Sequence, residues 1–226
     1  MITRRTLLTT ATGAAALALV GGAPAHAAPS PVTTGARRWS GGTSANGWRI
    51  DPASVRMHRI EGSTATATLH TGEAAAVLLH VARRWHYEIG ALDTGEAGGL
   101  TTHTTDRRIE ADFESNHLSG TALALHPAAY PCGGSERLWP HQEQIVRDIL
   151  ADCEGVVVWG GDLAPAKPSH FHITTRPGDK ALTRVAARLD TSRHTATRLQ
   201  TAGSAEDPLA PARRVRAEHL RRAQAR

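Results

Sequence analysis

Three short stretches of this sequence combine histidine with glycine, serine and aspartate in a pattern that favours a metal site. His117 lies within Ser-Asn-His-Leu-Ser-Gly, Trp-Gly-Gly-Asp occupies residues 159–162, and His-Phe-His occupies residues 170–172. Imidazole is a common zinc ligand, and zinc lowers the pKa of a bound water to about 7, which activates it as a nucleophile. The histidines lie near loop and strand ends far apart in the sequence, so the fold must assemble the site from distant segments.

In this order, the three stretches resemble the zinc D-Ala-D-Ala carboxypeptidases and L-alanyl-D-glutamate endopeptidases, which cut cell-wall peptides and share the Hedgehog/DD-peptidase fold. The family pattern is S-x-H-x-x-G-x-A-x-D, then W-G-G-D, then D/E-x-x-H-F. The resemblance extends from about residue 80 to residue 174, and residues 83–89 look like those of exported actinobacterial members. It implies a zinc cofactor, peptidoglycan stem peptides as substrates, His117 as the first zinc ligand and His170 as the last.

Two positions depart from the family pattern. The Asp that completes the family's zinc ligands falls on Ala124, and its catalytic carboxylate falls on Lys167. The chemistry needs three protein ligands on zinc and a general base that takes a proton from the bound water. Alanine offers no ligand atom, and a protonated lysine adds like charge beside the ion and cannot accept a proton.

Two further histidines could replace the missing ligand. His126 lies two residues beyond Ala124 on the same strand face, and His172 shares a face with His170 in the same way, because side chains alternate along a strand. We expect His126 to be the third metal ligand if the site is rebuilt. The alternative is a histidine at the rim of the site that is held by hydrogen bonds.

Two carboxylates are candidates for the general base. Asp162 ends the Gly-Gly-Asp turn and Glu114 precedes the first histidine motif. The alternatives are that Asp162 braces its turn and that Glu114 is solvated. Arg107 and Arg108 are candidates for gripping a substrate carboxylate, with an exposed surface pair as the alternative.

The elements that must position these residues are short and mixed. Apolar spacing predicts a helix from Glu73 to Tyr87 and another that begins at Pro140 and ends at Gly155. Strands are expected near residues 64–69, 121–125, 156–159 and 171–174, and a last helix near residues 182–189. Helices and strands do not alternate regularly, which favours an α+β fold of the Hedgehog/DD-peptidase type, with a mostly antiparallel sheet and flanking helices.

The N-terminus indicates export. The chain has 226 residues, and residues 1–27 combine Arg4-Arg5, an apolar run and an Ala-His-Ala cleavage site, as in a twin-arginine signal peptide. We expect secretion to the cell envelope and no transmembrane segment after cleavage. Residues 28–55 are expected to be a linker or arm, residues 56–190 the peptidase-like domain, and residues 191–226 a basic tail.

The cysteines and the tail suggest how an exported chain is stabilised and attached. In an oxidising compartment, Cys132 and Cys153 are expected to form a disulfide. Six arginines face three acidic residues between positions 205 and 226, so the tail could bind anionic wall polymers; the alternative is a solvated, partly helical end. Nucleic acid is not expected as a partner, because no basic face interleaved with aromatic residues is seen in the body of the chain.

Two functions therefore remain open. One is an exported zinc metallopeptidase that cleaves stem peptides. The other is a catalytically inactive peptidase-like module that binds a wall peptide or a partner protein. Motifs typical of serine hydrolases and of nucleotide-binding folds are absent, so those classes lose support.

Overall fold

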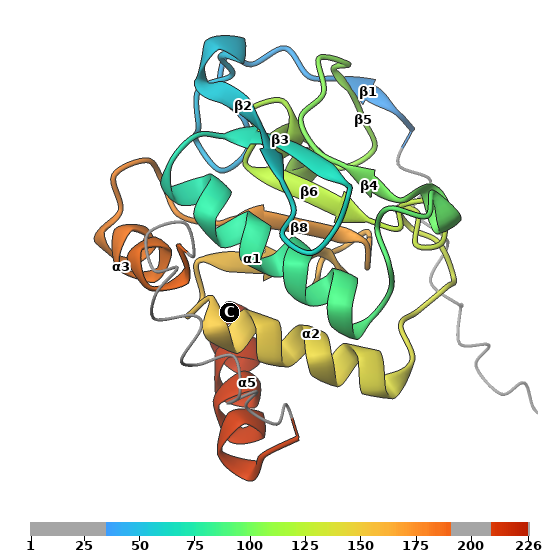
Figure 1. Ribbon diagram of the computed structural model, residues 1–226. Coiled ribbons are helices and arrows are strands. Elements are labelled where there is room, and N and C mark those ends of the chain that lie inside the picture. Colours follow the sequence, from blue (N-terminus) through green and yellow to red (C-terminus); the bar gives the residue numbers. More distant parts are fainter. Residues whose placement is uncertain (1–34, 191–208, 226) are drawn as a thin grey trace, which may run out of the picture. The chain divides into compact units, whose positions relative to one another are not determined.

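The structure is a computed structural model that describes residues 35–190 and 209–225. The expected signal peptide, the start of the arm and residues 191–208 lie outside the described residues. The elements are β1 (Arg37–Arg38), β2 (Val55–Arg59), β3 (Thr66–His70), α1 (Glu73–Glu88), β4 (Leu100–Thr101), β5 (Arg108–Ile109), β6 (Ala122–Leu125), α2 (Pro140–Asp152), β7 (Val157–Trp159), β8 (His170–Ile173), α3 (Lys180–Leu189) and α5 (Pro211–Gln224) (Figure 1). A 3-10 helix, η3 (Asp112–His117), leads into β6. The α+β fold class predicted from the sequence is confirmed.

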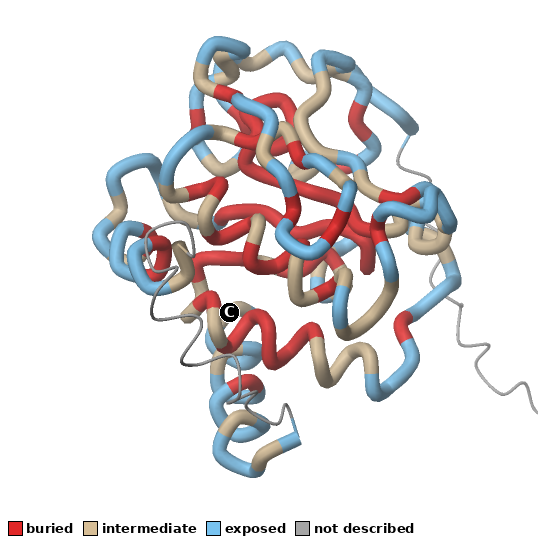
Figure 2. Tube along the Cα trace, in the orientation of Figure 1, coloured by how far each residue is buried: buried red, intermediate tan, exposed pale blue. Residues whose placement is uncertain are grey.

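The centre of the fold is a four-stranded antiparallel sheet in the order β4-β6-β8-β7. Helix α1 packs against β6 and β8 and also contacts α2 and α3 (Figure 1). Buried residues concentrate in β6 and β8 and in the neighbouring turns of α1 and α2 (Figure 2). Two small antiparallel pairs, β1 with β5 and β2 with β3, complete the sheets. Within the described residues, no helix has the length and apolar composition needed to cross a membrane.

The two helices predicted from apolar spacing are confirmed. The stripe of α1 is fully buried at Val77, Leu78, Val81 and Trp85. Pro140 is the first residue of α2, where its missing N–H costs no helical hydrogen bond. Gly155 follows that helix with a φ of 86°, a left-handed conformation that glycine adopts without strain.

The prediction of a loose arm over residues 28–55 is wrong for its described part. Trp48 is buried in the core, and its Nε1 donates a hydrogen bond to the Thr175 carbonyl at 2.7 Å. The Asn46 amide donates to Thr121 Oγ1 at 2.9 Å and to the Ile173 carbonyl at 2.7 Å. Besides the pairing of β1 with β5, this segment attaches by side-chain hydrogen bonds from loop residues, which leave no apolar period in the sequence.

The basic tail is also partly built into the fold. Arg84 Nη1 of α1 contacts Asp148 and Asp152 of α2 at 2.8 and 2.9 Å, and Arg213 of α5 bonds to the same two carboxylates, at 2.7 Å to Asp152. His80 Nε2 lies 3.2 Å from Asp152 Oδ2. Burial raises the pKa of the Asp152 carboxyl, but the contacts with His80 and Arg213 hold it well below its usual range. The network joins α1, α2 and α5.

The predicted disulfide is wrong: Cys132 and Cys153 are both free thiols. Cys153 is fully buried in the hydrophobic core at the end of α2. Cys132 lies in the loop after β6, half-buried beside Glu110 and Glu114. The two thiols occupy separate surroundings, so the spacing of the cysteines in the sequence did not reflect a contact.

Replacing Asp148 by alanine should lower the free energy of unfolding by about 3 kcal/mol, because the change removes a buried partner of Arg84 and Arg213. Urea unfolding followed by circular dichroism measures it. The matched control, Glu218→Ala, removes a half-exposed acid that pairs within α5 and should cost less than about 0.5 kcal/mol. Equal losses in the two variants would show that the network does not stabilise the fold.

Candidate functional site

The pairing of β6 with β8 determines which residues face each other at the candidate site. Ala124 lies opposite His170, and Ala122 lies opposite His172. His170 and His172 share one face of β8 because side chains alternate along a strand. The position at which the family carries its aspartate is therefore next to His170, as the motif implied, and it holds a methyl group.

His117 reaches the same place from η3 and joins a chain of three imidazoles. Its Nε2 lies 3.2 Å from His170 Nδ1, and His170 Nε2 lies 3.1 Å from His172 Nδ1. The other nitrogen of His117, Nδ1, lies 2.8 Å from the Thr102 carbonyl oxygen. A carbonyl only accepts hydrogen bonds, so His117 Nδ1 carries a proton.

That proton determines the tautomers of the whole chain when the rings are neutral. His117 Nε2 must accept, so His170 Nδ1 donates to it; His170 Nε2 must then accept from His172 Nδ1. All three imidazoles are Nδ1–H tautomers, each donating toward Thr102. The last unprotonated nitrogen of the chain is Nε2 of His172.

The histidine chain is closed off from solvent. His170 is fully buried, and His117 and His172 are nearly so. The Phe113 ring lies over the chain, with its centroid 4.8 Å from that of His170 and 6.5 Å from that of His172. Burial lowers the pKa of His117 and of His172 to about 4, with the nearby Lys167 charge adding to the effect at His117. The imidazoles are therefore neutral at pH 7.

An ion pair stands beside this chain. Lys167 Nζ lies 2.5 Å from Glu114 Oε1, and both side chains are largely buried. Glu114 Oε2 accepts from the backbone N–H of Glu110 at 2.6 Å. Burial alone would raise the pKa of Glu114, but Lys167 and the backbone donors lower it below its usual range. Glu114 is thus not solvated; it is an ionised partner of Lys167 and has little tendency to take a proton.

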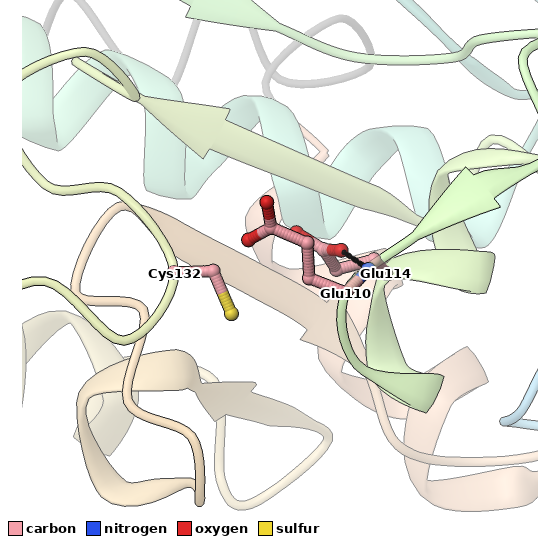
Figure 3. A group of neighbouring side chains, drawn as sticks. All are labelled: Glu110, Glu114 and Cys132. Atoms are coloured by element: carbon pink, nitrogen blue, oxygen red, sulfur yellow. Dashed lines mark hydrogen bonds between the residues drawn. The ribbon is translucent and has the colours of Figure 1, made fainter. Parts of the chain in front are cut away.

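Cys132 lies beside Glu114, the acid of this ion pair, and beside Glu110. Figure 3 shows its thiol near Glu110 and Glu114. Among the described residues, these form the only group of three or more His, Cys or acidic side chains whose ligand atoms all lie within 4.8 Å of one another. Burial and the Glu114 charge raise the pKa of the Cys132 thiol to about 11. The thiol is protonated at neutral pH, and Lys167 already neutralises Glu114.

The donor atoms do not fit the three-ligand zinc site that the resemblance implies. Two nitrogens each about 2.0–2.1 Å from a tetrahedral zinc would lie about 3.3 Å apart, as those of His117 and His170 do. A third donor is missing from the described cluster, because Ala124 offers none and His172 directs its Nδ1 to the far nitrogen of His170. The Lys167 ammonium also lies close enough to lower the pKa of both His117 and His170.

His126 does not join the other histidines. Its Nδ1 accepts from Trp85 Nε1 at 3.4 Å, and its Nε2 donates to the Ala91 carbonyl at 3.0 Å. Its backbone has a φ of 53°, so the strand has already ended there and the expected alternation of faces fails. Both ring nitrogens are occupied, which corresponds to the hydrogen-bonded alternative rather than to a metal ligand.

Asp162 and the two arginine candidates also serve other contacts. Asp162 forms two hydrogen bonds with Arg147, one of them 2.7 Å from Nη2 to Oδ1, and the Arg147 guanidinium lies 4.6 Å from the Trp159 ring centroid. Asp162 therefore braces its turn. Arg107 Nη1 donates to the Gly41 carbonyl at 2.9 Å, and Arg108 is exposed on β5.

Sequence reasoning missed Thr102 and Phe113. Thr102 acts through its backbone carbonyl, which leaves no trace in residue type. The only available signal for Phe113 was its place in the sequence, directly before Glu114 and a few residues before His117. Comparison of the chain with family models, with curated proteins and with solved structures gives no match.

Nitrogen-15 NMR of the imidazoles should find His117, His170 and His172 as neutral Nδ1–H tautomers at pH 7 without added metal. His126, which donates from Nε2, is the internal control and should be the opposite tautomer. An Nε2–H signal from His117 or His170 would contradict the hydrogen-bond chain.

Proposed function

We propose that this chain is an exported, non-hydrolytic relative of the zinc cell-wall peptidases that binds peptidoglycan stem peptides. The proposal combines the order of the three motifs with one structural observation. Lys167 occupies the position of the catalytic carboxylate and pairs at 2.5 Å with Glu114, the nearest remaining acid. The residue that should accept a proton is a cation, and the acid that could replace it is already neutralised.

The cluster is better suited to binding than to hydrolysis. Hydrolysis needs an ion held by three ligands and a base that moves a proton from water to the leaving amine. Neither requirement is met, because Ala124 supplies no third ligand and Lys167 is not a base. A stem peptide ends in a carboxylate, which would bind at Lys167 by replacing Glu114 as the partner of the ammonium. The half-buried Phe113 ring, which covers the histidine chain, would present an apolar surface to the peptide's D-alanine side chains.

The second candidate is the active zinc peptidase. One observation favours it: the 3.2 Å between His117 Nε2 and His170 Nδ1 is close to the spacing of two nitrogens on one zinc ion. In that case water or the substrate would have to supply the remaining ligands. Zinc would provide a polarised water, while His117 and His170 would hold the ion.

Attachment to the envelope remains part of the proposal. Arg213 is committed to Asp148 and Asp152, but Arg214, Arg216, Arg221 and Arg222 of α5 are exposed. Arg214 forms no salt bridge with a described residue, whereas the other three pair with Glu154 or Glu218. These exposed arginines would favour anionic wall polymers through an interaction that salt weakens.

The test is a titration of the chain with a stem pentapeptide ending in D-Ala-D-Ala, with equimolar zinc present. Calorimetry should show saturable binding, and no D-alanine should be released. Lys167→Ala should weaken binding about tenfold or more, because the peptide carboxylate loses its cation.

The double variant Ala124→Asp/Lys167→Glu restores both carboxylates and should release D-alanine, whereas Ala124→Asp alone, the matched control, should not. Zinc-dependent release by the unmodified chain that His117→Ala abolishes would establish the second candidate instead. A result with no peptide binding and no D-alanine release would exclude both candidate functions.

A further inference from the structure

A pocket of about 570 Å³ lies between the loop after β6, residues 128–130, and the segment that leads into α2, residues 136–140. Its size falls within the range of about 300–1,000 Å³ found for small-molecule sites. It shares no lining residue with the histidine chain or with Lys167 and Glu114. An inference about it is therefore independent of the proposed function.

The most prominent feature of this pocket is an exposed tryptophan on a rigid backbone. Trp139 is 67% exposed although large aromatic residues are usually buried. Its backbone N–H donates to Gln142 Oε1 at 3.0 Å, Pro140 begins the helix directly after it, and Leu138 before it is buried. The indole ring is thus presented to solvent by a backbone that is anchored on both sides.

The polar groups around Trp139 carry no net charge. Glu136 and Arg137 contribute one acid and one base, and Arg137 Nη1 is already held by the carbonyls of Gly134 and Glu136 at 2.7 and 2.9 Å. The Glu136 carboxylate forms no salt bridge within the described part of the chain. Tyr130 is anchored through its carbonyl, which accepts from Ser169 Oγ at 2.7 Å. Balanced charge favours an uncharged ligand rich in hydroxyl groups.

We propose that this pocket binds a neutral saccharide. The apolar C–H face of a pyranose ring would stack on the Trp139 indole, and the Glu136 carboxylate would accept hydrogen bonds from its hydroxyls. Tyr130 also lines the pocket. An indole combines apolar area with few rotatable bonds, so little conformational entropy is lost on stacking.

The experiment is a tryptophan-fluorescence titration of the full chain with two neutral trisaccharides, cellotriose and tri-N-acetylchitotriose. Trigalacturonate and triglucosamine serve as anionic and cationic probes of the same size. At least one neutral trisaccharide should give a saturable change, and Trp139→Ala should weaken binding at least about tenfold, as measured by calorimetry. Glu136→Gln should weaken it less, and Tyr87→Ala, a matched change of an exposed aromatic outside the pocket, should leave it unchanged.

Three results would overturn the proposal. The first is the absence of saturable binding by either neutral trisaccharide. The second is equal affinity of Trp139→Ala and the unmodified chain, with Trp139→Phe included to separate loss of stacking from loss of folding. The third is binding of a charged trimer, or of a proline-rich peptide, in clear preference to both neutral sugars.

Discussion

The antiparallel register of β6 against β8 is the constraint on which the candidate site depends. It places position 124 beside His170 and position 122 beside His172, so one pair of strands positions two of the three histidines. Helix α1 covers these strands, and η3 brings His117 to their end. A shift of one residue would turn the histidines to the opposite face of the sheet. The register thus holds Ala124, the position that the resemblance assigns to a third metal ligand, directly beside His170.

Electrostatics explains why this geometry is compatible with a stable fold. Three neutral imidazoles satisfy one another by hydrogen bonds that end on the Thr102 carbonyl, so the buried donors are used. Lys167 and Glu114 neutralise each other at the edge of the chain. A buried lysine without Glu114 would be costly, and Glu114 without Lys167 would add an unpaired negative charge. The pair acts as a substitute for the charge balance that a metal ion and its carboxylates would provide.

The sequence predicted the parts of the fold that have a period or a distinctive residue. The apolar stripes of α1 and α2 and the proline that starts α2 were sufficient to locate those helices. The contacts of Trp48 and Asn46, and the ion network through Asp148 and Arg213, join segments with no periodic relation, so they could not be predicted. His126 shows the same limit. The alternation of side chains along a strand predicts its face only if the strand continues, and the strand ends at Leu125. At the site, the motifs brought His117 and His170 together, but the direction of each imidazole nitrogen depends on a backbone carbonyl.

We infer that this fold is stable without a bound zinc, because Ala124 and Lys167 stand at the two positions where the resembled family has carboxylates. The most direct measurement is the zinc content of the purified chain by elemental analysis, after preparation without chelator and with zinc in the growth medium. We expect less than about 0.1 zinc per chain, because two imidazoles hydrogen-bonded to each other bind zinc weakly without a third ligand. The zinc content of His117→Ala should be the same. One zinc per chain that is lost in His117→Ala would contradict it.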